Sequence, residues 1–201
     1  MVTRELEIMA DGEYIRNLSH VRLTGRIMPS FYPYPYYLRI WNGPKSLLQR
    51  LLRTKEIKVQ QGMRILAAGE VVDVTEEKVE EGRLVTVTFA MGYHLWNSWV
   101  SLTVGAGVTA GDTVRQLLCA AGSRYTLLND PPFNPVFARP QSFFGRLPDA
   151  IANVLSACEI QPQVIASGII LLPVEDCNFE VVMDLDSVSG PWIHKYVKAI
   201  E

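Results

Sequence analysis

Two stretches of the chain share one pattern and decide its fold class: GDTVRQLLCAAG at residues 111–122 and GRLPDAIANVLSA at residues 145–157. Each begins with a glycine and continues with apolar residues at helical spacing, which predicts a short amphipathic helix. An apolar run follows each stretch, at residues 125–128 and 164–172, and predicts a strand. We therefore expect two helix-strand units in the second half of the chain.

The apolar faces of these two helices predict the core of this half. Residues three or four positions apart lie on the same side of a helix. The residues expected to be buried on this basis are Leu117, Leu118, Ile151, Val154 and Leu155. Neither unit carries a catalytic motif such as Gly-x-Ser-x-Gly, so the pattern indicates a scaffold.

The first half of the chain has the pattern of an antiparallel β domain. Its short runs alternate polar and apolar residues, as strands with one buried face do. These runs lie at residues 4–9, 21–27, 36–41, 56–60, 65–74 and 83–91, with a further one at 99–104. Four leucines between residues 46 and 53 share one helical face and predict one short helix.

The change of pattern near residue 98 predicts a domain boundary. We expect an antiparallel, barrel-like β domain over residues 1–98 and a small α+β domain over residues 99–178. Residues 179–201 are expected to add a C-terminal strand and tail, with a turn at residues 189–191. The predicted fold class of the whole chain is therefore α+β.

The composition argues against several classes of function. Charged residues make up 20% of the chain and the net charge is −2, whereas a nucleic-acid-binding domain carries a basic surplus. No apolar run reaches the roughly 18 residues of a membrane span. The three cysteines, Cys119, Cys158 and Cys177, are widely spaced and form no Cys-x-x-Cys pair. Cys119 and Cys158 lie on or beside apolar helix faces, so we expect buried free thiols rather than a structural zinc site.

Glycines before the first of the two helices allow two binding hypotheses. Three glycines between residues 105 and 111 follow a strand and precede a helix, which is the setting of a phosphate-binding turn, although their spacing differs from the dinucleotide fingerprint. The sequence GDT at residues 111–113 resembles the start of the peptidoglycan-binding lysin motif. A helix cap at Asp112 or Thr109 is the simpler interpretation. We expect no cofactor, and a cell-wall-binding module stays as the alternative function.

Candidate catalytic and metal-binding residues are scattered along the sequence. The three histidines are far apart, and a catalytic nucleophile needs a base within hydrogen-bonding reach. An enzyme that uses His94 or Cys119 is a third hypothesis. Asp184 and Asp186 share one face of a predicted strand, but no further metal ligands accompany them. We therefore expect no catalytic and no metal-binding residues.

The aromatic run FYPYPYYLRIW at residues 31–41 is the candidate protein-contact surface. Tyrosine offers a large contact area at a small cost in entropy, and the prolines confine the first part of the run to an edge or an irregular segment. Packing over an open end of the β domain is the other interpretation. The residues assigned to the contact surface are Tyr32, Tyr34, Tyr36, Tyr37 and Trp41.

The order of the motifs resembles the baseplate-hub and tail-hub proteins of bacteriophages, prophages and contractile injection systems. The resemblance covers about residues 36–190. Its motifs are LRIWN at 38–42, IKVQQG at 57–62, AGEVVDV at 68–74, LVTVTF at 84–89, GVTAGDTVRQL at 107–117, GRLPDAI at 145–151, GIILLP at 168–173 and DLDSVSGP at 184–191. Such hubs usually continue into a further β domain, so we expect this sequence, which ends at Glu201, to be a shortened member or a fragment.

The resemblance implies a structural protein of the virion tail, made in the cytoplasm of a bacterial host. Proteins of this kind assemble with copies of themselves into a ring, expected here to be a trimer. The ring joins the tail tube to the spike or to other tail proteins, and DNA passes through it without specific base contacts. The resemblance implies neither a cofactor nor an enzymatic activity. Rigid β domains with free edges suit such a ring.

Overall fold

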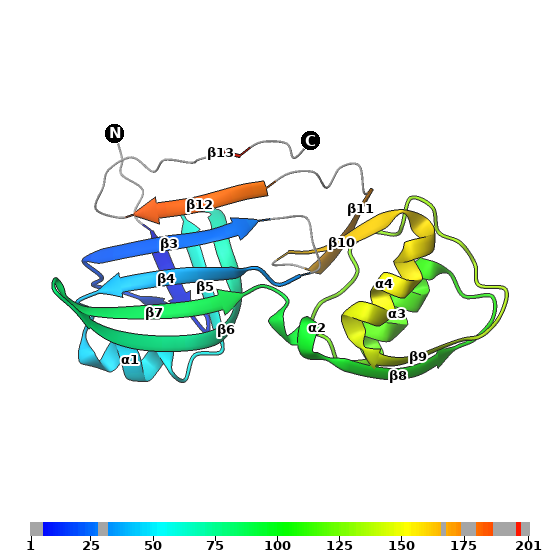
Figure 1. Cartoon of the computed structure of the whole chain (residues 1–201), viewed down its shortest axis with the longest axis horizontal. Coiled ribbons are helices and arrows are strands. Elements are labelled where there is room, and N and C mark those ends of the chain that lie inside the picture. Colours follow the sequence, from blue (N-terminus) through cyan, green and yellow to red (C-terminus); the bar gives the residue numbers. More distant parts are fainter. Residues whose placement is uncertain (1–5, 28–31, 166–167, 174–179, 187–195, 198–201) are drawn as a thin grey trace. The chain divides into compact units, whose positions relative to one another are not determined.

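A computed structural model describes residues 6–27, 32–165, 168–173, 180–186 and 196–197 (Figure 1). The chain divides into two compact units. The first takes in residues 1–27, 34–91 and 180–198, and the second takes in residues 28–33, 92–179 and 199–201. Strands and helices are both present, with the strands paired antiparallel in sheets, so the predicted α+β class is confirmed.

The first unit is built on one antiparallel sheet of nine strands. In chain order they are β1 (Glu7–Ala10), β2 (Glu13–Ile15), β3 (His20–Ile27), β4 (Pro35–Trp41), β5 (Glu56–Gln61), β6 (Arg64–Val79), β7 (Gly82–Ala90), β12 (Glu180–Asp186) and β13 (Tyr196–Val197). Across the sheet the order is β13-β12-β3-β4-β7-β6-β5-β1-β2. Helix α1 (Lys45–Leu51) follows β4.

Alternate residues along these strands point into a single core. Leu23 of β3 pairs with Leu38 of β4, which pairs with Val87 of β7, so the three form one fully buried row. Ile8 of β1 and Val59 of β5, near the other end of the sheet, belong to the same core. When strands near both ends of a sheet contribute side chains to the same core, the sheet must coil around that core. This coiling gives the barrel-like form that the sequence predicts (Figure 1).

Strand β6 is long enough to pair with two different neighbours. Its residues 64–70 pair with β5, and its residues 70–79 pair with β7. Gly69 lies at the change of partner, where a Cβ would stand 2.4 Å from the carbonyl carbon of Ala90. Glycine is therefore required for the close approach of the two strands.

The second half of β6 has one unpaired edge. From Asp73 to Val79 it pairs with β7 on one side, and no other described strand lies on its opposite side. The exposed side chains of Glu76, Glu77 and Lys78 lie along this part of the strand. Charged residues are the usual means by which an exposed edge avoids unwanted pairing.

The C-terminal strand β12 belongs to the first sheet. It pairs with β3 from Val181, opposite Ile27, to Asp186, opposite Arg22. Arg22 also donates two hydrogen bonds to the Asp184 carboxylate, from Nε at 2.8 Å and from Nη2 at 2.6 Å. The structure thus divides the chain differently from the ranges 1–98, 99–178 and 179–201, because the first unit includes residues 180–186 and its second segment ends at Met91. The turn expected at residues 189–191 lies outside the described residues.

The second unit combines helices with two pairs of strands. The helices are α2 (Tyr93–Asn97), α3 (Ala110–Ala120) and α4 (Leu147–Leu155), with a 3-10 turn at Ser156–Cys158. One two-stranded sheet pairs β8 (Trp99–Val104) with β9 (Gln141–Arg146), and a hairpin pairs β10 (Ile160–Ile165) with β11 (Gly168–Pro173). Helices α3 and α4 lie against each other and against the sheet of β8 and β9 (Figure 1).

The core predicted for this half is confirmed, whereas one predicted strand is not formed. The five helix residues expected to be buried all are: Leu117, Leu118, Ile151, Val154 and Leu155. The strand expected at residues 125–128 is reduced to a single bridge between Leu127 and Ile169. Pro131 and Pro132 follow closely and have no N–H groups to donate to a ladder. The sequence analysis also missed β9, which supplies the partner of β8.

Replacing Leu155 by alanine should destabilise the protein strongly. The side chain is almost fully buried in the core of the second unit, and Leu155→Ala should lower the free energy of unfolding by ~2–5 kcal/mol through lost burial and a new cavity. Denaturant unfolding followed by circular dichroism measures this change. Asn153→Ala, at an exposed position of the same helix, is the control and should change it by less than ~0.5 kcal/mol. A loss below about 1 kcal/mol for Leu155→Ala would contradict the assigned helix face.

Candidate functional site

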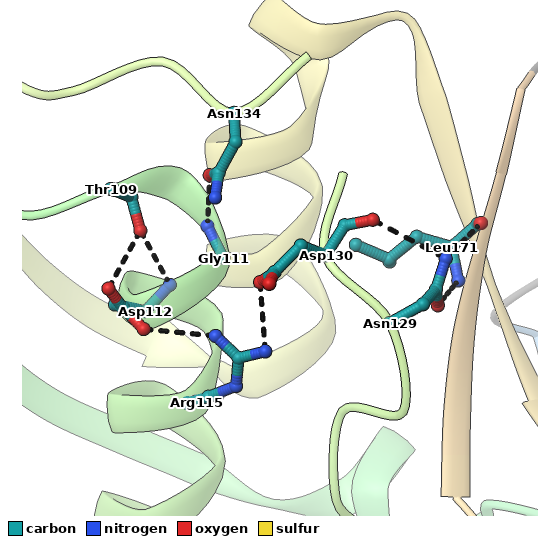
Figure 2. A network of polar contacts seen from close by, with 8 residues as sticks. All are labelled: Thr109, Gly111, Asp112, Arg115, Asn129, Asp130, Asn134 and Leu171. Carbon is teal, nitrogen blue, oxygen red and sulfur yellow. Dashed lines mark hydrogen bonds and ion pairs between the residues drawn. The ribbon is translucent and has the colours of Figure 1, made fainter. Parts of the chain in front are cut away.

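The start of α3, where the sequence suggested a phosphate or peptidoglycan site, is closed by contacts within the chain. The Thr109 hydroxyl accepts a hydrogen bond from the Asp112 N–H at 3.1 Å, and Asn134 Oδ1 accepts one from the Gly111 N–H at 2.9 Å (Figure 2). The preceding N–H of the helix bonds to the carbonyl of Pro135 at 2.9 Å. A helix start binds phosphate through free N–H groups, and here these groups have internal acceptors.

Arg115 fastens the loop that covers this helix start. Its Nη1 lies 2.9 Å from Asp112 Oδ1 on the helix, and its Nη2 lies 2.8 Å from Asp130 Oδ1 on the loop (Figure 2). Gly111 leaves room for the same loop, because a Cβ there would stand 2.6 Å from Asp130 Oδ1. The GDT sequence therefore has a structural role. Along the chain β9 stands between α3 and α4, so the two helices are not consecutive elements.

The Asn129 side chain hydrogen-bonds to β11 two residues after Leu127, whose bridge to Ile169 is the last backbone pairing of this segment with β11 among the described residues. Its Nδ2 donates to the carbonyl of Leu171 at 2.9 Å, and its Oδ1 accepts from the N–H of Leu171 at 2.8 Å (Figure 2). The side-chain amide thus takes the place that a peptide group would occupy in a strand. This contact ties the loop over α3 to the edge of β11.

The aromatic run divides between the core and the surface of the first unit. Tyr36 is buried and stacks on Phe89 with 5.3 Å between ring centroids, whereas its neighbour Tyr37 is exposed on the opposite face of β4. Trp41 is half-buried and stacks on His20 at 4.0 Å. The assignment of Tyr36 to a contact surface is therefore corrected, because successive residues of a strand point to opposite faces.

The two other tyrosines of the run lie before β4. Tyr32 is 51% exposed, and its ring lies edge-on to Trp96 with 5.1 Å between centroids. Tyr34 is half-buried. A contact role for the exposed members of the run stays a prediction.

The sheet of β8 and β9 presents an aromatic outer face that the sequence analysis missed. Trp99 is 66% exposed and Phe144 is 86% exposed. They share this face, because Trp99 pairs with Arg146 and Phe144 pairs with Ser101, two residues further along β8. Val100, on the opposite face, is buried in the core of the second unit. The face that turns away from the helices is thus the one that carries the exposed rings.

Arg146 extends this outer face toward α2. Its guanidinium lies 4.9 Å from the centroid of the Trp96 ring, and its Nη2 donates to the Trp96 carbonyl at 3.4 Å. Tryptophan, tyrosine and arginine are the residues that most often dominate the energy of protein interfaces. We call the set of these residues the ribbon face: Tyr32, Trp96, Trp99, Phe144 and Arg146.

The sequence contained a signal for this face. Phe143 and Phe144 are adjacent, and in a strand only one of two neighbours can face the helices. Trp99 has the same parity as Ser101 and Thr103, the polar positions of its strand. An aromatic residue on the polar side of an amphipathic strand is informative, because large exposed apolar groups often mark interaction sites.

The candidate catalytic residues lie on different helices, His94 on α2 and Cys119 on α3. Both are exposed, which corrects the burial expected for Cys119, whereas Cys158 is buried as expected. Burial raises the pKa of the Cys158 thiol, which lowers its reactivity at neutral pH. Among the described residues, no three histidine, cysteine, aspartate or glutamate side chains come together to hold a metal ion. The helices of the described segments are not long and apolar enough to cross a membrane.

Comparison with known proteins identifies the fold. No protein-family model matches the chain, and no curated protein is significantly similar to it in sequence. A tail protein from Neisseria meningitidis matches 83% of the chain with a TM-score of 0.64 and 13% identity. The 43 kDa tail protein of prophage MuSo2 from Shewanella oneidensis matches 84% with a TM-score of 0.64 and 9% identity.

A third match connects the fold to secretion systems. A component of the type VI secretion system of E. coli, described as structurally similar to the T4 bacteriophage tail proteins gp27 and gp5, matches 82% of the chain with a TM-score of 0.55 and 13% identity. The chain covers 49%, 54% and 48% of these three structures, which is about half of their length. The resemblance to tail proteins read from the sequence is confirmed at the level of the fold.

Removing the Asn129 amide should destabilise the second unit. Asn129→Ala leaves the N–H and carbonyl of Leu171 without their hydrogen bonds to the side-chain amide and should lower the free energy of unfolding by about 1–3 kcal/mol. Denaturant unfolding, with Asn153→Ala again as the control, measures the change. An effect no larger than that of the control would show that water replaces the amide without loss.

The burial of Tyr36 predicts a loss of stability at high pH. Burial raises the pKa of Tyr36 from 10.0 to about 12, so the neutral hydroxyl stabilises the fold fully below pH 10, and this contribution is lost as the pH rises through about 12. The loss attributable to Tyr36 should be about 2 kcal/mol at pH 12, since one pKa unit corresponds to about 1.4 kcal/mol.

Unfolding curves of the wild type and of two variants between pH 9 and pH 12 test this prediction. Tyr36→Phe should remove that part of the pH dependence, because the ring stays and the ionisable group is gone. Tyr37→Phe, which removes an exposed hydroxyl on the same strand, is the matched control for the loss of a tyrosine hydroxyl. Identical slopes for the wild type and Tyr36→Phe would contradict the burial of this hydroxyl.

Proposed function

We propose that this chain is a structural component of a phage or prophage tail, within the baseplate-hub or tail-tip ring that joins the tail tube to the spike. The observation that carries the proposal is the fold. The coiled nine-stranded sheet and the α+β unit together match tail proteins from two bacteria over 83% and 84% of the chain. A third match, in a secretion system, is itself compared with phage tail proteins.

The physical character of the two units supports a mechanical role. Each unit has a continuous core of closely packed apolar side chains, which gives a stiff body with low compressibility. Each unit also presents strand edges without a partner among the described strands, at β6 in the first and at β8 and β9 in the second. A ring of identical subunits needs stiff bodies and complementary surfaces.

The proposal specifies the partners and the location of the protein. Copies of the chain assemble into a trimeric ring, which contacts other tail or spike proteins in the virion tail after synthesis in the bacterial cytoplasm. The net charge of −2 suits a channel through which DNA passes without specific binding, because such binding requires a basic surface. The role requires neither a reaction nor a cofactor.

A simple assay distinguishes the proposed tail protein from the alternative, a peptidoglycan-binding module. The alternative relies on the GDT sequence at the start of α3, where the Gly111 N–H donates to Asn134 of the loop and the Asp112 N–H donates to the capping residue Thr109. Incubation with insoluble peptidoglycan followed by centrifugation should leave the protein in the supernatant. Retention in the pellet would favour the cell-wall module over a purely structural part.

The test of the proposed function is the presence of the protein in assembled tails. In cells that carry the native gene cluster, the gene is deleted and restored with an epitope-tagged copy, and tail particles are purified for immunogold electron microscopy. We expect gold at one end of the tail, and no complete tails in the deletion strain. Normal tails in the deletion strain, without label after complementation, would overturn the proposal.

A further inference from the structure

We propose that the two-stranded sheet of β8 and β9, which carries the ribbon face, pairs edge to edge with the free edge of β6 on a neighbouring copy of this chain, head to tail. The inference rests on the proposed function, because it names the surfaces through which the ring would form. Unpaired strand edges, exposed aromatic rings and the distribution of charge support it.

The first argument is backbone hydrogen bonding. Strands β8 and β9 pair only with each other among the described strands, so each has one open edge of six residues. The open edge of β6 runs over a similar length, from Asp73 to Val79. An open edge presents unpaired N–H and C=O groups and is a template for pairing with another chain. Pairing the two edges would continue the sheet from one copy into the next.

The second argument is the exposure of two large aromatic side chains. Trp99 and Phe144 stand on one face of a two-stranded sheet, where they cover none of the core. Arg146 and Trp96 frame this pair with a cation-π contact at 4.9 Å. Adjacent exposed aromatic residues bordered by polar groups are typical of a surface that a partner covers.

The charges of the two surfaces are opposite, which identifies a second copy of this chain as the partner. The segments that carry most of the ribbon face, residues 96–104 and 139–146, contain two arginines, Arg139 and Arg146, and no acidic residue. The hairpin between β6 and β7, residues 76–83, contains four glutamates against one lysine and one arginine. Surfaces of opposite sign attract each other, and like charges placed face to face repel each other. A second copy of this chain therefore supplies the complementary surface.

The same charges specify a head-to-tail contact. Two ribbon faces brought together would oppose arginine to arginine, and two β6 edges would oppose glutamate to glutamate. A contact between different surfaces of identical chains is heterologous, and it closes into a ring when the rotation between copies is suitable. The inferred contact thus has the symmetry that a ring requires.

The experiment uses two variants that each damage one surface. Phe144→Ser removes the most exposed ring of the ribbon face, and the double substitution Glu77→Lys/Glu80→Lys reverses charge along the edge of β6 and the adjoining turn. Phe133→Ser and Glu159→Lys are the controls, because both residues are exposed and lie outside the two surfaces. Circular dichroism and thermal unfolding confirm that each variant is folded. Sedimentation velocity over a wide range of concentration then measures association.

We expect the wild type and both controls to associate reversibly, and more weakly in high salt. The dissociation constant for self-association of each damaged variant should rise by roughly tenfold or more, as expected when an interface hot spot is lost. An equimolar mixture of the two damaged variants should form a dimer and nothing larger. In that dimer the intact β6 edge of Phe144→Ser meets the intact ribbon face of the double variant.

Three results would overturn the inference. They are a wild type that stays monomeric at every concentration, a Phe144→Ser variant that associates like the wild type, and a mixture that stays monomeric. The tail-particle experiment distinguishes this failure from failure of the proposed function. Normal incorporation of Phe144→Ser into labelled tails would leave the function standing and would show that another surface forms the ring.

Discussion

The division of side chains between the two faces of a strand is the constraint on which this structure depends. In the first unit, Leu23, Leu38 and Val87 all point to the inner face of the sheet and form one row of the core. In the second unit it buries Val100 and leaves its neighbour Trp99 exposed. Because successive residues of a strand must point to opposite faces, one geometrical rule generates both the cores of the two units and the exposed aromatic face of β8 and β9.

Local patterns in the sequence were sufficient for the elements whose stability is local. The helices α3 and α4, with their buried faces, follow directly from apolar spacing, and the alternating runs of the first half are strands. Pairing between distant segments was not predictable in this way. The partnership of β12 with β3 joins residues at opposite ends of the chain, and β9 carries the pattern QSFFGR, whose adjacent phenylalanines obscure its alternation. Register and partner choice depend on tertiary contacts that a local pattern does not contain.

The candidate sites show the same limit. The start of α3 could be read from sequence as a cap, a phosphate turn or a cell-wall motif, because all three use small and polar residues before a helix. The loop of Asn129, Asp130 and Asn134 bonds to polar groups of that turn and of β11, an arrangement that favours the cap (Figure 2). Likewise only the position of the aromatic run on β4 shows that Tyr36 belongs to the core and Tyr37 to the surface.

We propose that the chain forms part of a ring at the end of a tail tube. Electron cryo-microscopy of tail particles from cells that carry the native gene cluster would show this ring. We expect, at the junction of tube and spike, a ring whose density accommodates in each subunit a coiled nine-stranded sheet and an α+β unit with two adjacent helices. A junction whose density is accounted for entirely by other proteins would contradict it.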